Sequence, residues 1–454
     1  MWLAESLRSK SLIESRQGWT RSQLLEHQQR SLRDLLHRVW KDSPFYREYY
    51  GNHGIQEKDL SDITVRDLPI LDKETLMDGF DRISTDPVLR RNRLEAWLHS
   101  ESRNPYEGRY MVVHTSGSSG NMGIFVYDKE AWGRTRGIIM ARSNLGRAVN
   151  PFRRFRFAMC VATHGHFGAV TAAQTLPRLL FKVCTCSVLD PIQTTLDTLN
   201  RFQPEQLGGY STTLHELAQA SLDGKLDIRP QAVTPGGEPL SEEAAITMEK
   251  AWGVVPMQAY ASSESMCLAL SLPGREGLTL MEDEHIFEVL DAEGGAVAPG
   301  EVGRMVMTNL YNRAMPLIRY DMRDYVTRGS RPEGERFDSI VRVEGRVNDA
   351  LPVCLEDGSA DSLHPIVLSE FFVPGATKFQ FVSESPGRVV IRYRATENRD
   401  SSVREAFDRL LQMKGALAST SARVERTEDL GVDPRTGKYR LVVLAADPAE
   451  GQGG

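Results

Sequence analysis

Short apolar runs alternate with helical patterns between residues 108 and 265, and this alternation most constrains how the chain can fold. Short apolar runs bounded by turn residues predict strands, and apolar residues three and four apart predict amphipathic helices. The predicted strands are 109–114, 155–162, 181–189 and 254–260. The predicted helices are 129–147, 167–180, 191–202, 212–222 and 241–252. Strands that alternate with helices are typical of βαβ units, so we expect an α/β domain built on a parallel sheet.

Two helices carry clear start signals. Thr20 and Gln23 form a capping box ahead of an apolar face, in a region of residues 1–60 that reads as helical. Ser241 suits an N-cap, and Gly253 directly follows the last apolar residue of the predicted helix 241–252. These signals fix where both helices begin.

The pattern changes after residue 278. From 278 to 345, strands separated by turns predict an antiparallel β subdomain. In the last hundred residues, a strand over 389–393, a helix opened by a capping box at Ser402 and Glu405, and a strand over 439–444 predict a small α+β domain. We therefore expect an N-terminal domain of residues 1–346, a hinge at 347–350 and a mobile C-terminal domain of residues 351–454.

Composition excludes several classes of protein. The chain has 454 residues, 41% of them hydrophobic, and is long enough for two or more domains. A net charge of -6, with both signs interspersed, argues against a nucleic-acid or membrane-surface partner. No run of about 18 apolar residues predicts a membrane span, and no signal peptide pattern opens the chain. Five cysteines, an odd and sparse set, predict reduced thiols in the cytoplasm.

A run of small and hydroxylated residues follows the strand that ends at His114. It consists of Thr115, Ser116, Gly117, Ser118, Ser119 and Gly120. Glycine lets the backbone approach a ligand closely, and exposed N–H and hydroxyl groups can bind phosphate. No Gly-Lys-Ser/Thr closes the run, so it lacks the common phosphate-loop spacing, and alone it equally fits a flexible surface loop.

Four further stretches accompany this loop. They are 236–239 (Gly-Gly-Glu-Pro), 260–264 (Tyr-Ala-Ser-Ser-Glu), 319–324 (Arg-Tyr-Asp-Met-Arg-Asp), and 345–349 (Gly-Arg-Val-Asn-Asp) with Gly437-Lys438. Each alone also fits an ordinary turn, loop carboxylate or hairpin lysine. In this order the set resembles the adenylate-forming superfamily of acyl-CoA synthetases, non-ribosomal adenylation domains and luciferases. The nearest branch is phenylacetate–CoA ligase-like, with coenzyme F390 synthetase and capsule-biosynthesis relatives, which residues 35–47 and 68–73 also resemble.

The resemblance implies a nucleotide site. The loop of residues 115–120 would hold the β- and γ-phosphates. The segment packed against adenine would consist of Gly236, Gly237, Glu238 and Pro239. Tyr260 would stack on adenine, Ser263 would contact the α-phosphate, and Glu264 would bind Mg²⁺. One carboxylate suffices because Mg²⁺ keeps most of its waters.

The resemblance also assigns roles further along the chain. Asp324 matches the acid that accepts the ribose hydroxyls, and Arg346 matches the arginine beside ribose and phosphate. Lys438 matches the catalytic lysine that bridges the substrate carboxylate and the α-phosphate. Asn348 and Asp349 match the hinge, with Asn348 in place of the first of two acids.

An acyl pocket is expected from two further segments and the turn after residue 260. Its predicted wall consists of His164, His166, Phe167, Gly168, Tyr210, Ser211 and Ala261. Two histidines two residues apart could also bind metal, but no third ligand is evident, and a satisfied structural histidine is the close alternative. Cys267 is present, but Thr279 stands where the histidine of a zinc site would be expected, so zinc is not predicted. Cys184 and Cys186 fit a buried strand better than half a metal site.

Two departures from the family pattern matter. Asn121-Met122-Gly123 follows the loop where Pro-Lys is usual, so the loop itself supplies no lysine, and charge for the phosphates is expected from Mg²⁺ and Lys438. Met322 and Arg323 stand where Thr and Gly are usual, which bears on the geometry around Asp324.

The resemblance implies an ATP-dependent, AMP-forming carboxylate ligase. A carboxylic acid, guessed to be aryl or medium-sized, would become an acyl-adenylate, and the C-terminal domain would then rotate to admit an acceptor. The expected cofactors are ATP and Mg²⁺, with CoA as the acceptor that gives a thioester. The alternatives are a carrier-protein phosphopantetheine, an amine, an adenylyltransferase of the F390-synthetase type, and a non-catalytic nucleotide binder.

Overall fold

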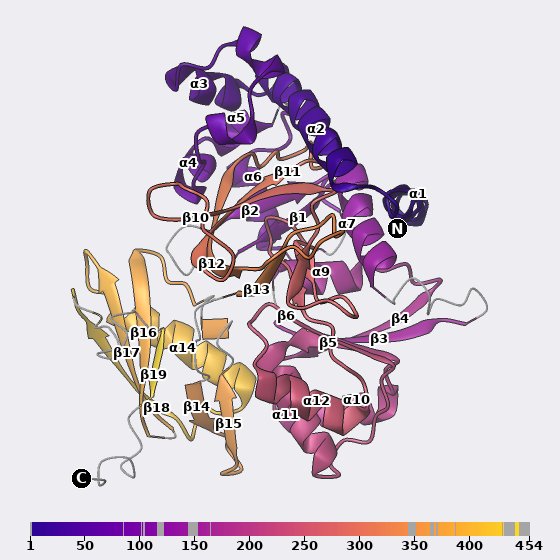
Figure 1. Cartoon of the computed structure of the whole chain (residues 1–454). Coiled ribbons are helices and arrows are strands. Elements are labelled where there is room, and N and C mark those ends of the chain that lie inside the picture. The colour runs from indigo at the N-terminus through magenta and orange to yellow at the C-terminus, as the bar shows by residue number, and fades with distance from the viewer. Residues whose placement is uncertain are drawn as a thin grey trace, which may run out of the picture.

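The computed structural model of the chain describes most of its length (Figure 1). The described residues are 2–84, 86–100, 102, 105–115, 122–143, 153–163, 165–343, 351–363, 367–368, 371–385, 387–428, 430 and 441–444. In Figure 1 the N-terminal helices, in indigo, lie above the central sheet, and the C-terminal sheet, in orange and yellow, lies to one side.

The N-terminal region is helical, as predicted. Its elements are α1 (Leu3–Ser15), α2 (Arg21–Asp42), α3 (Pro44–Asn52), η1 (Glu57–Ser61), η2 (Val65–Asp67), α4 (Lys73–Asp78), α5 (Phe80–Ile83) and α6 (Arg91–Leu98). The capping box at Thr20 and Gln23 is confirmed, because each residue's side chain accepts from the other's backbone N–H. The predicted apolar face of α2 is buried.

The predicted parallel sheet is confirmed. Its parallel strands are β3 (Phe155–Val161), β4 (Phe181–Ser187), β5 (Gln206–Tyr210), β6 (Ala232–Gly236) and β7 (Ala259–Tyr260). The accompanying helices are α9 (Gly168–Gln174), α10 (Ile192–Phe202), α11 (Ser211–Leu222) and α12 (Glu242–Trp252). Leu199, Leu217 and Met248, from three of these helices, pack with Leu207 and Val233 of the sheet in one core. A hairpin of β1 (Met111–His114) and β2 (Ile124–Tyr127) leads into α7 (Lys129–Arg142).

The predicted antiparallel strands continue this sheet. They are β8 (Ala269–Leu270), β9 (Leu278–Leu280), β10 (His285–Leu290), β11 (Val302–Asn309), β12 (Tyr320–Arg328) and β13 (Ser339–Val343). Hydrogen bonds from β7 to β8 and from β8 to β9 join both halves into a sheet of eleven strands over the described residues. The prediction of antiparallel pairing was right, but these strands form no separate sheet.

Several predicted boundaries need correction. The strand expected over 254–260 is reduced to Ala259–Tyr260, since Pro256 lacks the N–H that a sheet requires. The helix expected over 167–180 ends at Gln174, shortly before Pro177. The strand expected to be buried over 181–189 is the edge strand β4, paired with β3 alone among the described strands and largely half-exposed.

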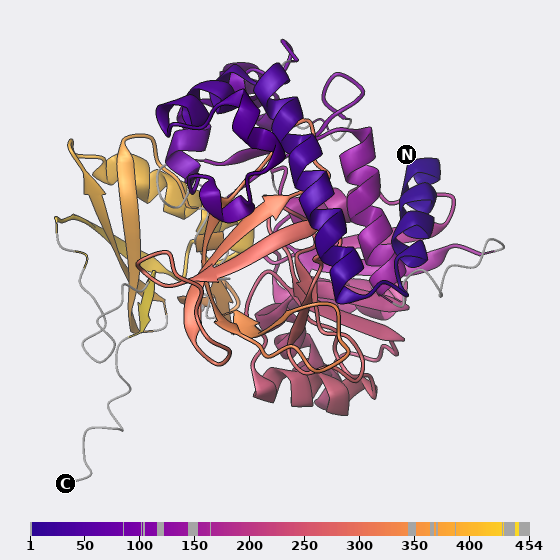
Figure 2. The ribbon, with the colours of Figure 1, turned by 45° about the horizontal axis from the view of Figure 1, so that its top comes forward.

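The C-terminal region is α+β, as predicted. A hairpin of β14 (Leu351–Cys354) and β15 (Ala360–Leu363) precedes a sheet of β16 (Ala376–Ser385), β17 (Arg388–Ala395), β18 (Ser421–Arg426) and β19 (Val442–Leu444). In Figure 2 this sheet and its helix α14 (Asp400–Lys414) again lie to one side of the other elements. The capping box predicted at Ser402 is wrong, because α14 begins at Asp400, where Tyr393 Oη donates to the Asp400 carboxylate.

Together these elements confirm the predicted α/β fold class with a smaller C-terminal α+β region. Within the described part of the chain, no helix is both long and apolar enough to cross a membrane.

Candidate active site

Two of the predicted nucleotide-binding stretches, 236–239 and 260–264, lie at the ends of the neighbouring strands β6 and β7. Parallel strands place their carboxyl ends along one edge of the sheet, where α/β folds form ligand sites. Strand β6 ends at Gly236, and β7 ends at Tyr260. A Cβ on Gly236 would lie 3.0 Å from the carbonyl oxygen of Ala259, so glycine permits this close approach of the two strands.

The turn that carries Glu264 is held by hydrogen bonds on several sides. Tyr127 Oη donates to the carbonyl oxygen of Ser263 at 2.7 Å, and Ser263 Oγ donates to the carbonyl oxygen of His114 at 3.1 Å. Ser265 N–H donates to Ser262 Oγ at 3.2 Å. The turn therefore joins the end of β7 to the end of β1, where the predicted phosphate loop begins.

Glu264 is a buried carboxylate in a charged setting. Burial raises its pKa, and nearby Asp324 adds to that rise. Part of this rise in pKa is offset by three groups: its own backbone N–H, the cation of Lys73 and a hydrogen bond from Ser262. A buried carboxyl beside another acid gains strongly from a bound cation, so the setting of Glu264 fits the predicted Mg²⁺ ligand.

Lys73 lies beside this carboxylate, and the sequence interpretation missed it. It is 9% exposed, and its Nζ donates to Thr115 Oγ1 at 3.1 Å. Burial lowers its pKa, while Glu264 raises it. Asp72 caps α4 by accepting from Thr75 N–H at 2.7 Å, which fixes Lys73 as the first residue of that helix. The expectation that Mg²⁺ and Lys438 alone supply positive charge is therefore incomplete.

Thr115 anchors both ends of the predicted loop. Its Oγ1 accepts from Gly123 N–H at 2.9 Å, and its own N–H donates to the carbonyl oxygen of Gly123 at 2.8 Å. A Cβ on Gly123 would lie 3.0 Å from both Thr115 Oγ1 and Lys73 Cε, so this glycine leaves room for the lysine. The loop thus begins next to a buried ammonium group.

Tyr260 and Asp324 are brought together by the fold. Tyr260 Oη donates to Asp324 Oδ2 at 2.6 Å, and burial followed by the Asp324 charge raises the Tyr260 pKa. Arg323 has φ of 59°, in the left-handed region that favours the glycine expected there. Its N–H donates to Asp321 Oδ1 at 2.8 Å, and its guanidinium forms an ion pair with Glu74 of α4, so polar contacts hold this backbone.

The segment 236–239 is tied to α11. Glu238 Oε2 accepts from Thr212 N–H at 3.1 Å and from Thr212 Oγ1 at 2.9 Å. Ser211 Oγ donates to the carbonyl oxygen of Glu238 at 3.1 Å. Ser211, predicted as a pocket wall, thus contacts the predicted adenine segment.

Among the predicted acyl-pocket residues, Phe167 and Tyr210 belong to one buried apolar cluster. His166 is buried, packs against Trp97 with tilted rings whose centroids are 4.3 Å apart, and has Nε2 3.3 Å from the carbonyl oxygen of Ser100, so it fits the structural alternative. Phe167 packs on His114 at 4.4 Å. A Cβ on Gly168 would contact Met266 Sδ at 2.7 Å, so Gly168 lies close to the turn after β7.

The other two predicted wall residues follow or end parallel strands. Tyr210 Oη accepts from Ala162 N–H at 3.3 Å, which holds the end of β5 to the residue after β3. Ala261 is half-buried directly after β7.

In the described part of the chain, no group of three or more His, Cys, Asp or Glu side chains is arranged to hold a metal ion. Burial raises the pKa of the Cys267 thiol to about 12, and Thr279 pairs with Ser339 across two strands. A Mg²⁺ ion held by one carboxylate and by phosphate oxygens needs no such group.

The other predicted site residues lie outside the described residues. They are Ser116, Gly117, Ser118, Ser119, Gly120, His164, Arg346, Asn348, Asp349 and Lys438. The predicted hinge also falls there, so these assignments stay predictions.

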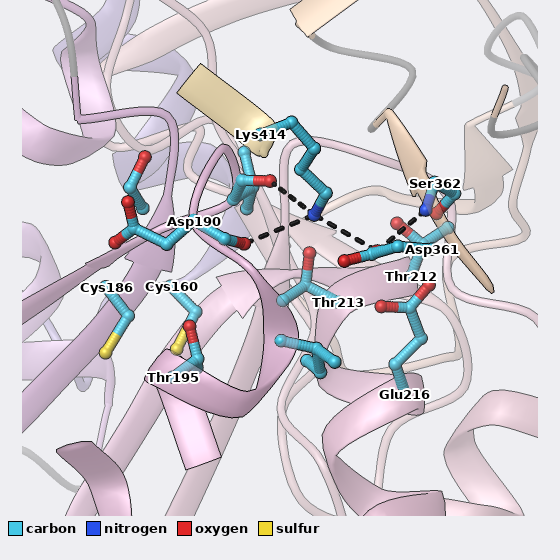
Figure 3. Close-up of a pocket in the computed structure, with 13 residues that line it drawn as sticks. Cys160, Cys186, Asp190, Thr195, Thr212, Thr213, Glu216, Asp361, Ser362 and Lys414 are labelled. Carbon is cyan, nitrogen blue, oxygen red and sulfur yellow. Dashed lines mark hydrogen bonds and ion pairs between the residues drawn. The ribbon is translucent and has the colours of Figure 1, made fainter. Parts of the chain in front are cut away.

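A cavity of about 30 Å³ lies elsewhere, between the parallel strands and the C-terminal region (Figure 3). Lys414, at the end of α14, points into this seam, where its Nζ contacts Asp361 Oδ1 at 3.1 Å and the carbonyl oxygen of Asp190 at 3.2 Å. Neither Glu264 nor Asp324 lines the cavity. It is a packing feature of the seam rather than the nucleotide site.

Comparison with known proteins agrees with this geometry. No protein-family model matches the chain. It is 24% identical over 377 residues to protein CapK of Staphylococcus aureus, covering 81% of this chain and 78% of that protein. It is also 24% identical to a phenylacetate–coenzyme A ligase of Pseudomonas putida, over 75% of each chain.

The solved structures of 2-hydroxyisobutyryl-CoA ligase share the fold. The complex in the thioesterification state has a TM-score of 0.59 at 16% identity, covering 92% of this chain and 89% of that one. The open conformation has a TM-score of 0.56 at 17% identity, covering 92% and 90%. These similarities support an adenylate-forming enzyme, that is, an ATP-dependent, AMP-forming ligase. In sequence the chain is similar to the phenylacetate–CoA ligases and to CapK.

Proposed function

We propose that this chain activates a carboxylic acid with ATP as an acyl-adenylate and then transfers the acyl group to the thiol of CoA. One observation carries the proposal. Buried Glu264, Lys73 and the Tyr260–Asp324 pair converge where β7 ends and the predicted phosphate loop begins. The names of the phenylacetate–coenzyme A ligases among the relatives support CoA as acceptor.

The first step joins the acid to AMP. A carboxylate oxygen attacks the α-phosphorus of ATP in line, a new P–O bond forms, and pyrophosphate leaves with the electrons of the broken bond. Phosphoryl chemistry of this kind depends on positioning and on neutralising charge. Lys73, at 3.1 Å from Thr115, lies where it can bind the departing phosphates. Glu264 would hold Mg²⁺, which when bound neutralises phosphate charge.

Other residues would orient the nucleoside. Asp324 would accept from the ribose hydroxyls, and the 2.6 Å hydrogen bond from Tyr260 fixes the orientation of that carboxylate. Tyr260 and residues 236–239 would enclose adenine. By family resemblance, Arg346 and the loop 115–120 would bind phosphate and ribose, and Lys438 would bridge the two reacting groups. A domain of residues 351–454 would carry Lys438 and rotate about residues 347–350.

The test is pyrophosphate exchange over a panel of carboxylic acids, followed by a change of acceptor. We expect exchange that depends on one class of acid, and then AMP together with an acyl-CoA thioester. A product that retains AMP would replace this proposal with an adenylyltransferase. Acyl transfer to a carrier protein or amine, with none to CoA, would show that CoA is not the acceptor. No exchange with any acid, despite ATP binding, would contradict activation itself.

A further inference from the structure

A buried row of polar side chains begins directly after Glu264. It consists of Ser265, His285, Tyr311, Asn309 and Thr135. These residues come from the turn after β7, from β10 and β11 and their neighbouring segments, and from α7. Ser265, His285 and Asn309 are each 0% exposed. Polar groups so deeply buried are costly unless each donor and acceptor is satisfied.

The contacts of His285 define its protonation. Its Nδ1 lies 2.9 Å from the carbonyl oxygen of Met281, which can only accept, so Nδ1 carries the proton. Burial lowers the pKa of His285 to about 4, so the ring is neutral at working pH and Nε2 is an acceptor. Ser265 Oγ, at 2.7 Å from Nε2, therefore donates to it.

The donor and the acceptor of each remaining contact follow from this hydrogen bond. Because the Ser265 proton points to His285, the 3.3 Å contact with Tyr311 is a hydrogen bond from Tyr311 Oη to Ser265 Oγ. Thr135 Oγ1, 3.1 Å from Tyr311 Oη, then donates to it. From α7 to the imidazole, each hydrogen bond of the row therefore has one donor and one acceptor. A fully satisfied network of this kind makes the site rigid.

The N-terminal helix α2 also holds the backbone at His285. Gln28 of α2 donates through Nε2 to the carbonyl oxygens of Glu282 and His285, both at 2.8 Å. The backbone that carries the imidazole is therefore held by α2 as well.

The same turn links Ser265 to Glu264. Ser262 Oγ accepts from Ser265 N–H at 3.2 Å, and the Ser262 side chain also forms a hydrogen bond with Glu264 that lowers its pKa. Ser265 is thus held through its hydroxyl by His285 and through its backbone by Ser262, which also contacts Glu264. We propose that the Ser265–His285 hydrogen bond positions Glu264 for a phosphate-bound metal ion, which makes His285 a positioning residue. The inference rests on the proposed function in that Glu264 is the Mg²⁺ ligand.

The test measures Mg²⁺-dependent binding of a non-hydrolysable ATP analogue by calorimetry, so no acid substrate is needed. Ser265→Ala and His285→Phe should raise the Mg²⁺ concentration for half-maximal binding about fivefold, the equivalent of one lost hydrogen bond. His285→Gln, whose amide oxygen can accept near the position of Nε2, should restore most of it. Thr135→Val is the matched control, because it removes a buried hydroxyl of the same row and leaves the Ser265–His285 bond intact.

The outcomes distinguish failure of the positioning role from failure of the proposed function. The positioning role is refuted if Ser265→Ala shows the same Mg²⁺ dependence as Thr135→Val, whatever their melting temperatures. If His285→Phe does not fold, Ser265→Ala and His285→Gln still decide the question. Absence of any Mg²⁺ effect on nucleotide binding by wild type would instead contradict the proposed function of Glu264.

Discussion

Lys73 offers the sharpest test of the charge distribution around the predicted phosphate loop. The residue is 9% exposed, and its ammonium group lies 3.1 Å from Thr115 Oγ1, the first hydroxyl of that loop. Replacing it in Lys73→Met removes the charge and keeps the apolar stem. A charge-assisted hydrogen bond to a phosphate oxygen is worth about 2–3 kcal/mol. The loss corresponds to roughly 30- to 150-fold in rate.

The assay is acid-dependent pyrophosphate exchange, with melting temperature measured in parallel. We expect exchange to fall by that factor with only a modest fall in melting temperature, because methionine removes a desolvated charge from the interior but leaves buried Glu264 without its nearby cation. Lys182→Met, on the exposed edge strand β4, is the matched control and should exchange like wild type. Exchange by Lys73→Met at the rate of Lys182→Met would refute the reasoning.

Four further predictions follow from other residues. Lys438→Ala should abolish pyrophosphate exchange with an unchanged circular-dichroism spectrum; exchange equal to wild type would reject its catalytic role. Glu264→Gln should raise the Mg²⁺ requirement for exchange more than it lowers the melting temperature. His285 has a lowered pKa of about 4, so its contribution to stability is present above pH 6.5 and lost as pH falls toward 4. Between pH 7.5 and 5, urea unfolding of wild type should therefore lose about 2 kcal/mol more than that of His285→Gln. Lys414→Met should cost about 3–5 kcal/mol by leaving Asp361 buried and unpaired, and the double variant with Asp361→Leu should recover part of it in thermal melts.

The sequence predicted features that depend on neighbouring residues. Thr20 with Gln23, and Ser241 with Gly253, act within one helical turn, and the structure has both helices where these signals lie. The βαβ alternation likewise predicted a parallel sheet with β3, β4 and β7, because short apolar runs and helical periodicity are local patterns. Strands β5 and β6 were not among the predicted strands, and the strand expected over 109–114 lies in the antiparallel β1–β2 hairpin instead. The order of the motifs predicted the superfamily although no single motif is specific.

Features that depend on contacts between distant residues could not be predicted from the sequence. Lys73 and Thr115 are 42 positions apart in the sequence, and no local pattern predicts their contact. The only signal was the N-cap residue Asp72 directly ahead of a lysine. His166 packs on Trp97, so its structural role depends on a helix far away in the chain. The antiparallel strands joined the parallel sheet through two-residue pairings at β7 and β8, which are too short to show any periodicity.

The central claim is that this chain makes an acyl-adenylate and passes its acyl group to CoA. The most direct measurement is mass spectrometry of the products formed by wild type from ATP, Mg²⁺, CoA and a panel of carboxylic acids. We expect AMP and an acyl-CoA thioester in equal amounts, for one class of acid and only with both ATP and CoA present. AMP found covalently attached to the acceptor, or ATP bound and never consumed with any acid, would contradict it.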